Sequence, residues 1–134
     1  MILRIKLLLI GLLIMINLTG QNFERYKWEN RILIIKAPNK EHINYKNQIS
    51  EFINSAEALA DRKMLIYEIV GDKFKKTNYL LSKNDTNWKT IETVEKREWS
   101  KVNKFKIRLI GLDGGIKFQK EGVIKKEELF EIID

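Results

Sequence analysis

"IRLIGLDGGIKFQKEG", residues 107–122, places two short, largely apolar runs on either side of a glycine-rich turn. Glycines beside an aspartate can surround a phosphate, hold a metal ion or simply bend the chain. A phosphate loop needs Lys and Ser/Thr opening a helix after the glycines, and a calcium loop needs further acids; neither is present here. We therefore interpret the stretch as an antiparallel β-hairpin. Its structural turn consists of Gly111, Asp113, Gly114 and Gly115.

Upstream of the hairpin, two further apolar runs predict strands. Residues 31–37 and 64–70 are rich in β-branched residues and too short for buried helices, so we expect strands buried on both faces. Between them, apolar residues recur at helical spacing and predict one helix that ends near Arg62, with Asn39 as its N-cap. The order strand, helix, strand predicts a parallel pair.

The rest of the chain completes a mixed α/β pattern. Residues 73–90 are polar and carry no clear assignment, 90–99 show a weak helical pattern, and 125–133 predict an amphipathic helix. With strands at 105–110 and 116–120, the order is β-α-β-α-β-β-α. This order predicts a thioredoxin-like three-layer sandwich, in which a four-stranded mixed sheet carries flanking helices on both faces.

The first 20 residues have the pattern of a secretory signal peptide. Residues 1–6 carry two positive charges, 7–18 are nearly all apolar, and a small residue, Gly20, stands at the expected cleavage point. The apolar run is shorter than the roughly 20 residues that span a bilayer. We therefore expect a signal peptide at 1–20, one exported domain at 21–134 and no stable membrane span after cleavage, in the periplasm or outside the cell. The alternative is an uncleaved N-terminal anchor.

Charge and cysteine content exclude several kinds of chemistry. The net charge is +7, but acids are interleaved with the basic residues, and this mixture together with export argues against a nucleic-acid partner. The chain has no cysteine, which excludes thiol redox chemistry on its own side chains and zinc sites built on thiolates. No histidines or carboxylates stand at metal-ligand spacing, so we expect neither a metal nor a cofactor.

The chain contains, in order, several short motifs that include Trp28-Glu29-Asn30-Arg31, Ala60-Asp61-Arg62, Gly111-Leu112-Asp113-Gly114-Gly115 and Ile133-Asp134. Together they resemble an uncharacterised thioredoxin-like domain family, a domain of unknown function found in secreted bacterial proteins. The same domain occurs in the sushi-repeat-containing proteins and in coiled-coil-domain-containing protein 80. The resemblance spans Trp28 to Asp134 and implies a thioredoxin- or peroxiredoxin-like fold, export and no settled activity. Leu112 stands where that family usually has lysine.

In thioredoxin-like folds the reactive thiol lies after the first strand, at the N-terminus of a helix. Here that segment is Pro38–His42 and has no thiol, but a helix N-terminus can still bind an anion. The candidate ligand-binding residues are Arg31, Lys40, His42, Gln48 and Arg62. For each there is a structural alternative: Asn39 caps a helix with Lys40 and His42 in solvent, and the arginines pair with a local acid, Asp61 or Asp113. Structural pairing is the more common outcome.

The sequence therefore favours an exported, non-redox binding or structural module, with an envelope or extracellular protein as a possible partner. The sheet edge and the groove at the N-terminus of the first helix are the expected contact surfaces. The alternative is a non-thiol enzyme or a small-anion-binding protein that uses the same groove, so the question of catalysis stays open. Trp28, Trp88 and Trp99 could form a platform for a sugar or peptide, although packing is the more common role of each.

Overall fold

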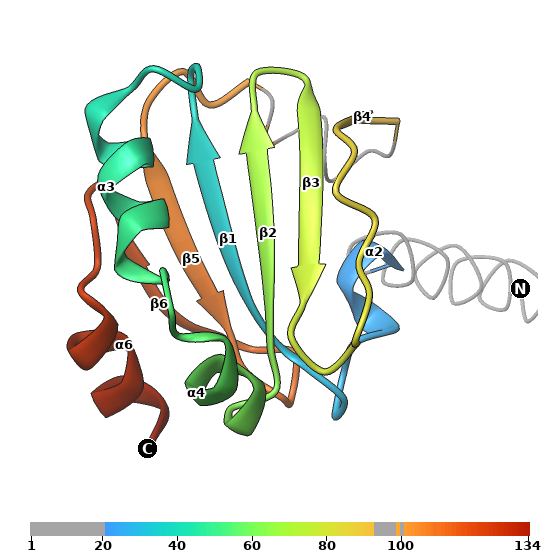
Figure 1. Cartoon of the computed structure of the whole chain (residues 1–134). Helices are drawn as coiled ribbons and strands as arrows, with labels where there is room; N and C mark the ends of the chain where they lie inside the picture. Colours follow the sequence, from blue (N-terminus) through green and yellow to red (C-terminus); the bar gives the residue numbers. More distant parts are fainter. Residues whose placement is uncertain (1–20, 93–98, 100) are drawn as a thin grey trace, which may run out of the picture.

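The computed structural model describes residues 21–92, 99 and 101–134. Within these residues the chain is a mixed α/β fold around one six-stranded sheet, in the order β4-β3-β2-β1-β5-β6 (Figure 1). The strands are β1 (Arg31–Ala37), β2 (Met64–Val70), β3 (Lys73–Asn78), β4 (Lys89–Thr90), β5 (Lys106–Ile110) and β6 (Ile116–Lys120). The helices are α2 (Gln21–Glu24), α3 (Ile43–Glu51), α4 (Ala56–Asp61) and α6 (Lys126–Ile133).

The centre of the sheet is the parallel pair β1 and β2, which run in register from Arg31 opposite Met64 to Ala37 opposite Val70. Every residue of β2 is buried, as its mostly apolar sequence predicts, and Glu68 is buried with them. Strand β5 is antiparallel to β1 and β6 is antiparallel to β5, so the expected hairpin is present. The turn is closed by a hydrogen bond from the Gly111 N–H to the Gly115 carbonyl at 2.8 Å, and Gly114 has φ +82°.

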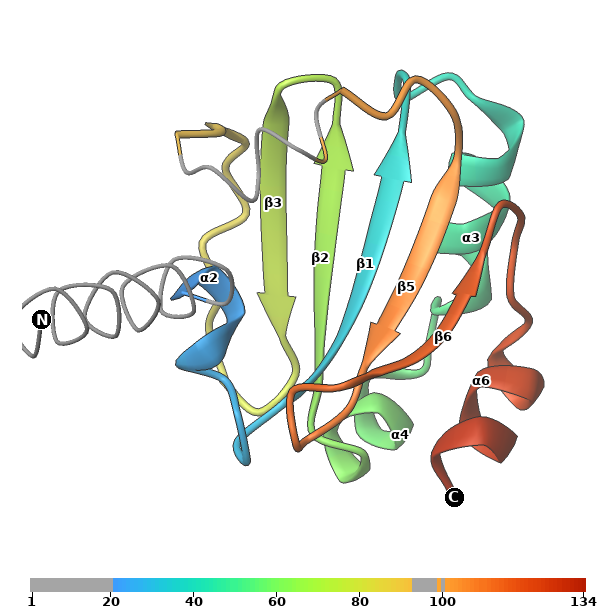
Figure 2. The ribbon, with the colours of Figure 1, turned by 180° about the vertical axis from the view of Figure 1, so that it is seen from behind.

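The prediction of a four-stranded sheet is wrong, because the sheet has six strands and the prediction lacked β3 and β4. Strand β3 lies beside β2, and β4 pairs with the start of β3 to form the edge (Figure 2). The sequence of β3, Lys-Phe-Lys-Lys-Thr-Asn, buries only Phe74 and lacks an apolar alternation. Its strand conformation depends on pairing with β2, which local sequence does not reveal.

The single helix expected between β1 and β2 is also wrong, because the chain forms two. Helix α3 ends at Glu51 and α4 begins at Ala56, and between them Asn54 adopts φ +60°, which a continuous right-handed helix cannot contain. The N-cap of α3 is His42 rather than the expected Asn39, and the His42 Nδ1 accepts the Asn44 backbone N–H at 3.2 Å. Asn39 instead accepts the Glu41 N–H in a tight turn.

Apolar side chains pack on both faces of the sheet. Helices α3, α4 and α6 lie on the face seen in Figure 1, over a core that includes Leu33, Leu59 and Leu129. The opposite face holds a second cluster that includes Tyr26 and Trp99. Most of the helix expected at 90–99 lies outside the described residues, because 93–98 are not described.

Candidate functional site

The predicted site residues at the start of α3 have structural roles. His42 caps α3, and its ring stacks on Phe105 with 6.0 Å between centroids. The Lys40 ammonium lies 4.5 Å from the centre of the Trp88 ring. The first helical turn is therefore capped by the protein itself, and the groove expected there is less available to an anion than the sequence suggests.

Gln48 is fully buried, and its amide makes two hydrogen bonds to one residue. Its Nε2 donates to the Ile124 carbonyl at 3.0 Å, and its Oε1 accepts the Ile124 N–H at 2.9 Å. The amide thereby holds the segment before α6 against α3. With both functional ends engaged and no exposed surface, Gln48 acts in folding.

Arg62 and Arg31 lie near each other, but neither pairs with the acids expected from sequence. Arg62 donates to both carboxylate oxygens of Asp134, at 3.0 and 2.7 Å, and its guanidinium lies 3.9 Å from the Phe130 ring centre. The hydrogen bond from Arg62 lowers the pKa of Asp134. Arg31 donates to the Arg62 carbonyl at 3.0 Å. Asp113 pairs instead with Lys117 at 2.8 Å. The five predicted residues therefore do not converge on one pocket.

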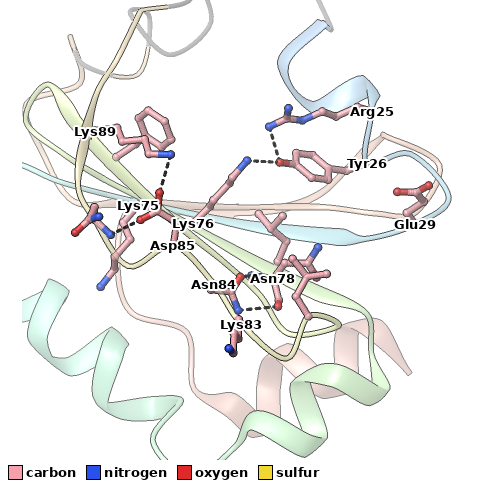
Figure 3. A pocket seen from close by; sticks show the side chains of 14 residues that line it. Arg25, Tyr26, Glu29, Lys75, Lys76, Asn78, Lys83, Asn84, Asp85 and Lys89 are labelled. Carbon is pink, nitrogen blue, oxygen red and sulfur yellow. Dashed lines mark hydrogen bonds and ion pairs between the residues drawn. The ribbon is translucent and has the colours of Figure 1, made fainter.

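A different cavity, which we call the basic pocket, has a volume of about 570 Å³. It lies between the segment after α2, strand β3 and the loop that leads to β4 (Figure 3). Leu65, Phe74 and Leu81 contribute apolar surface to it. Cations outnumber acids in its walls: the charged residues are Arg25, Lys75, Lys76, Lys83 and Lys89 against Glu29 and Asp85.

Tyr26 forms the centre of one wall of the basic pocket. Arg25 donates to its hydroxyl oxygen at 2.7 Å and Lys76 donates to the same oxygen at 3.0 Å, as the dashed lines in Figure 3 show. The tyrosine itself is only 8% exposed. Two cations thus lie within hydrogen-bonding distance of one neutral oxygen, an arrangement in which they repel each other. An anion beside them would replace that repulsion with attraction.

The opposite wall is a loop fixed to strand β3 by asparagine side chains. Asn84 accepts the Asn78 N–H at 2.8 Å and donates to the Asn78 carbonyl at 3.1 Å. Farther along, Asp85 pairs with Lys89 at 2.9 Å. A backbone hydrogen bond from Asn87 and the pairing with Lys89 lower the pKa of Asp85, so this acid stays ionised and Lys89 balances its charge. Lys83 has no ion pair among the residues that the structure describes.

Sequence reasoning missed the basic pocket because residues 73–90 had no assigned structure. One signal was present: Phe74 stands between lysines, and Lys75, Lys76, Lys83 and Lys89 give this segment an excess of positive charge. That signal does not reveal that Arg25 and Tyr26, about fifty residues earlier, form the facing wall. The convergence arises only when the segment after α2 lies beside β3.

The described residues show neither a metal centre nor a membrane span. Within the described parts of the chain, no three His, Asp or Glu side chains form a group that could hold a metal ion. None of the described helices is long and apolar enough to cross a bilayer.

The fold and the basic pocket define a mixed α/β domain with a cationic cavity beside its outer strands. The chain belongs to the family described as Domain of unknown function (DUF4174), whose family model matches residues 22–134. No curated protein matches the sequence. No solved structure matches it either.

Proposed function

We propose that this chain is an exported, non-redox binding domain that holds an anionic ligand in the basic pocket. The absence of cysteine argues against thiol chemistry, and the cavity has a size typical of small-ligand sites. The observation that carries the proposal is the convergence of Arg25 and Lys76 on the Tyr26 hydroxyl. Their remaining N–H donors suit a carboxylate, phosphate or sulfate group.

The proposal includes a thioredoxin-like arrangement and export. Four adjacent strands, β2-β1-β5-β6, contain one parallel pair and one antiparallel hairpin, and a helical crossover joins the parallel pair. This is the strand order that a thioredoxin-like core requires, with β3 and β4 added outside β2. The charged and apolar pattern of residues 1–20 supports export, in line with the resemblance to secreted proteins. The anionic group could belong to an envelope or extracellular partner.

The groove at the N-terminus of α3 has less support as the anion site. His42 caps that helix end and Lys40 lies over Trp88. A non-thiol enzyme there would need a nucleophile or base beside His42, and the neighbouring ring of Phe105 supplies neither.

Calorimetric titration of the purified protein with phosphate, citrate and acetate, at fixed ionic strength, tests the proposal. At least one of these anions should bind, and Arg25→Gln and Lys76→Gln should each weaken binding about tenfold or more, because each removes a charge-assisted hydrogen bond. Lys120→Gln is the matched control, since Lys120 is an exposed cation on β6, away from the pocket.

Two outcomes contradict the proposal. In one, no anion binds, or the pocket variants bind as the control does. In the other, His42→Asn, which retains a capping side chain, weakens binding while Arg25→Gln does not. The second outcome would favour the α3 groove.

A further inference from the structure

A second cavity, which we call the Trp28 groove, has a volume of about 490 Å³. One side of it is formed by Arg31, the first residue of β1, and by Trp28, three residues before it. Leu112, in the hairpin turn, forms another side. Ile132 and Ile133, in the last turn of α6, complete the walls. The start of β1, the hairpin turn and the end of α6 therefore meet at this groove. The cavity shares no lining residue with the basic pocket.

Trp28 combines a strained backbone with an exposed side chain. Its φ is +67°, in the left-handed region that bulky residues rarely adopt, and its N–H donates to the Leu112 carbonyl at 2.6 Å. The residue is 64% exposed. Core packing does not account for a large apolar ring held in water on a strained backbone. Strain of this kind concentrates where a side chain contacts a ligand.

Arg31 gives the groove a positive charge that the protein balances only in part: Arg62 and, to a smaller extent, Arg31 lower the pKa of the Asp134 carboxyl. Among the described residues the Arg31 guanidinium forms no ion pair, and its one hydrogen bond uses a single N–H, to the Arg62 carbonyl. The two nearby acids are occupied: Asp134 by Arg62 and Asp113 by Lys117. The remaining guanidinium donors of Arg31 match the geometry of a carboxylate.

We propose that the Trp28 groove binds a small carboxylic acid with an apolar body. The carboxylate pairs with Arg31, and the apolar body packs against Trp28, Leu112 and Ile132. The charge complementarity at Arg31 favours this ligand over an uncharged one, and the volume suits a small molecule. The site stands apart from the basic pocket and from the function proposed for it.

Titration of the purified full chain with decanoate and with 1-decanol tests the proposal by NMR. The indole N–H signal of Trp28, assigned by its loss in Trp28→Phe, should shift on addition of decanoate. Decanol, which has the same chain without the charge, should bind at least fivefold more weakly. Arg31→Gln should remove the difference between the two ligands, while Lys120→Gln, at an exposed position that lines neither cavity, should leave it unchanged.

A second variant separates ligand contact from folding. Trp28→Gly relieves the strain at φ +67°, so its unfolding midpoint in urea should equal or exceed that of the wild type, while decanoate binding falls at least tenfold. The proposal is overturned if decanoate and decanol bind equally to the wild type, or if decanoate leaves the Trp28 signal unmoved. It is also overturned if sedimentation shows that the wild type is a dimer while Trp28→Gly is a monomer, because a second copy of the chain then covers Trp28.

Discussion

Gln48 and Ile124 are 76 residues apart in the chain and joined by two hydrogen bonds, one in each direction, inside the protein. Replacing Gln48 with Leu leaves the N–H and carbonyl of Ile124 buried without partners. Each such group costs about 1–3 kcal/mol, so the free energy of unfolding should fall by about 2–5 kcal/mol. Urea unfolding followed by circular dichroism measures this change.

The control for Gln48→Leu is Gln119→Leu, at an exposed position on β6. It should change stability by less than about 1 kcal/mol. Equal effects of the two variants would show that Gln48 has no special structural role, and would return it to the candidates for ligand binding.

The pair Arg62–Asp134 predicts a pH dependence of stability. The hydrogen bond from Arg62 lowers the pKa of Asp134 in the folded state, so the pair stabilises the protein above the unfolded pKa of about 4. This contribution is lost as the pH falls through the folded pKa. Because both groups contact solvent, we expect a small effect.

Asp134→Asn isolates that contribution, because other acids with lowered pKa values, such as Asp85 and Asp113, remain in both proteins. The difference in urea midpoint between wild type and variant should be largest near pH 7 and shrink below pH 4. A difference that stays constant, or grows, in acid would show that Asp134 is not bound by Arg62 as a carboxylate.

The hairpin turn requires glycine at Gly114, whose φ is +82°. Gly114→Ala forces an L side chain into the left-handed region and should lower the free energy of unfolding by about 1–2 kcal/mol. Gly122→Ala is the matched control, since its added Cβ meets only ordinary contacts with Lys120. Thermal unfolding of both variants checks the expectation, and a loss at Gly122 as large as that at Gly114 would contradict it.

A different effect is expected at Gly111, where an added Cβ would collide with the Lys117 side chain at Cε. Gly111→Ala should move Lys117 away from Asp113 and break their ion pair. The measurement is the pKa of Asp113 by carbon-detected NMR: it should rise in Gly111→Ala, because the pair with Lys117 lowers it in the wild type. An unchanged pKa would mean that Lys117 reaches Asp113 without passing over Gly111.

The sequence predicted strands β1, β2, β5 and β6 but not β3 and β4, which form one edge of the sheet, and the difference has a physical reason. Strands β1 and β2 consist mostly of apolar residues, so the local sequence is enough to predict that they are buried. Strand β3 has mostly charged residues and becomes a strand by pairing with β2. Side-chain partners were missed for the same reason: Arg62 pairs with Asp134, 72 residues away, rather than with its neighbour Asp61. The basic pocket likewise depends on contacts between distant segments.

The central claim is that Arg25 and Lys76, around the Tyr26 hydroxyl, bind the anionic group of a ligand. The most direct measurement is a crystal structure of the protein with the anion that binds most tightly in the titration. The account predicts an anion oxygen within about 3 Å of donors on both Arg25 and Lys76. An anion bound elsewhere, with the basic pocket empty at a saturating concentration, would contradict it.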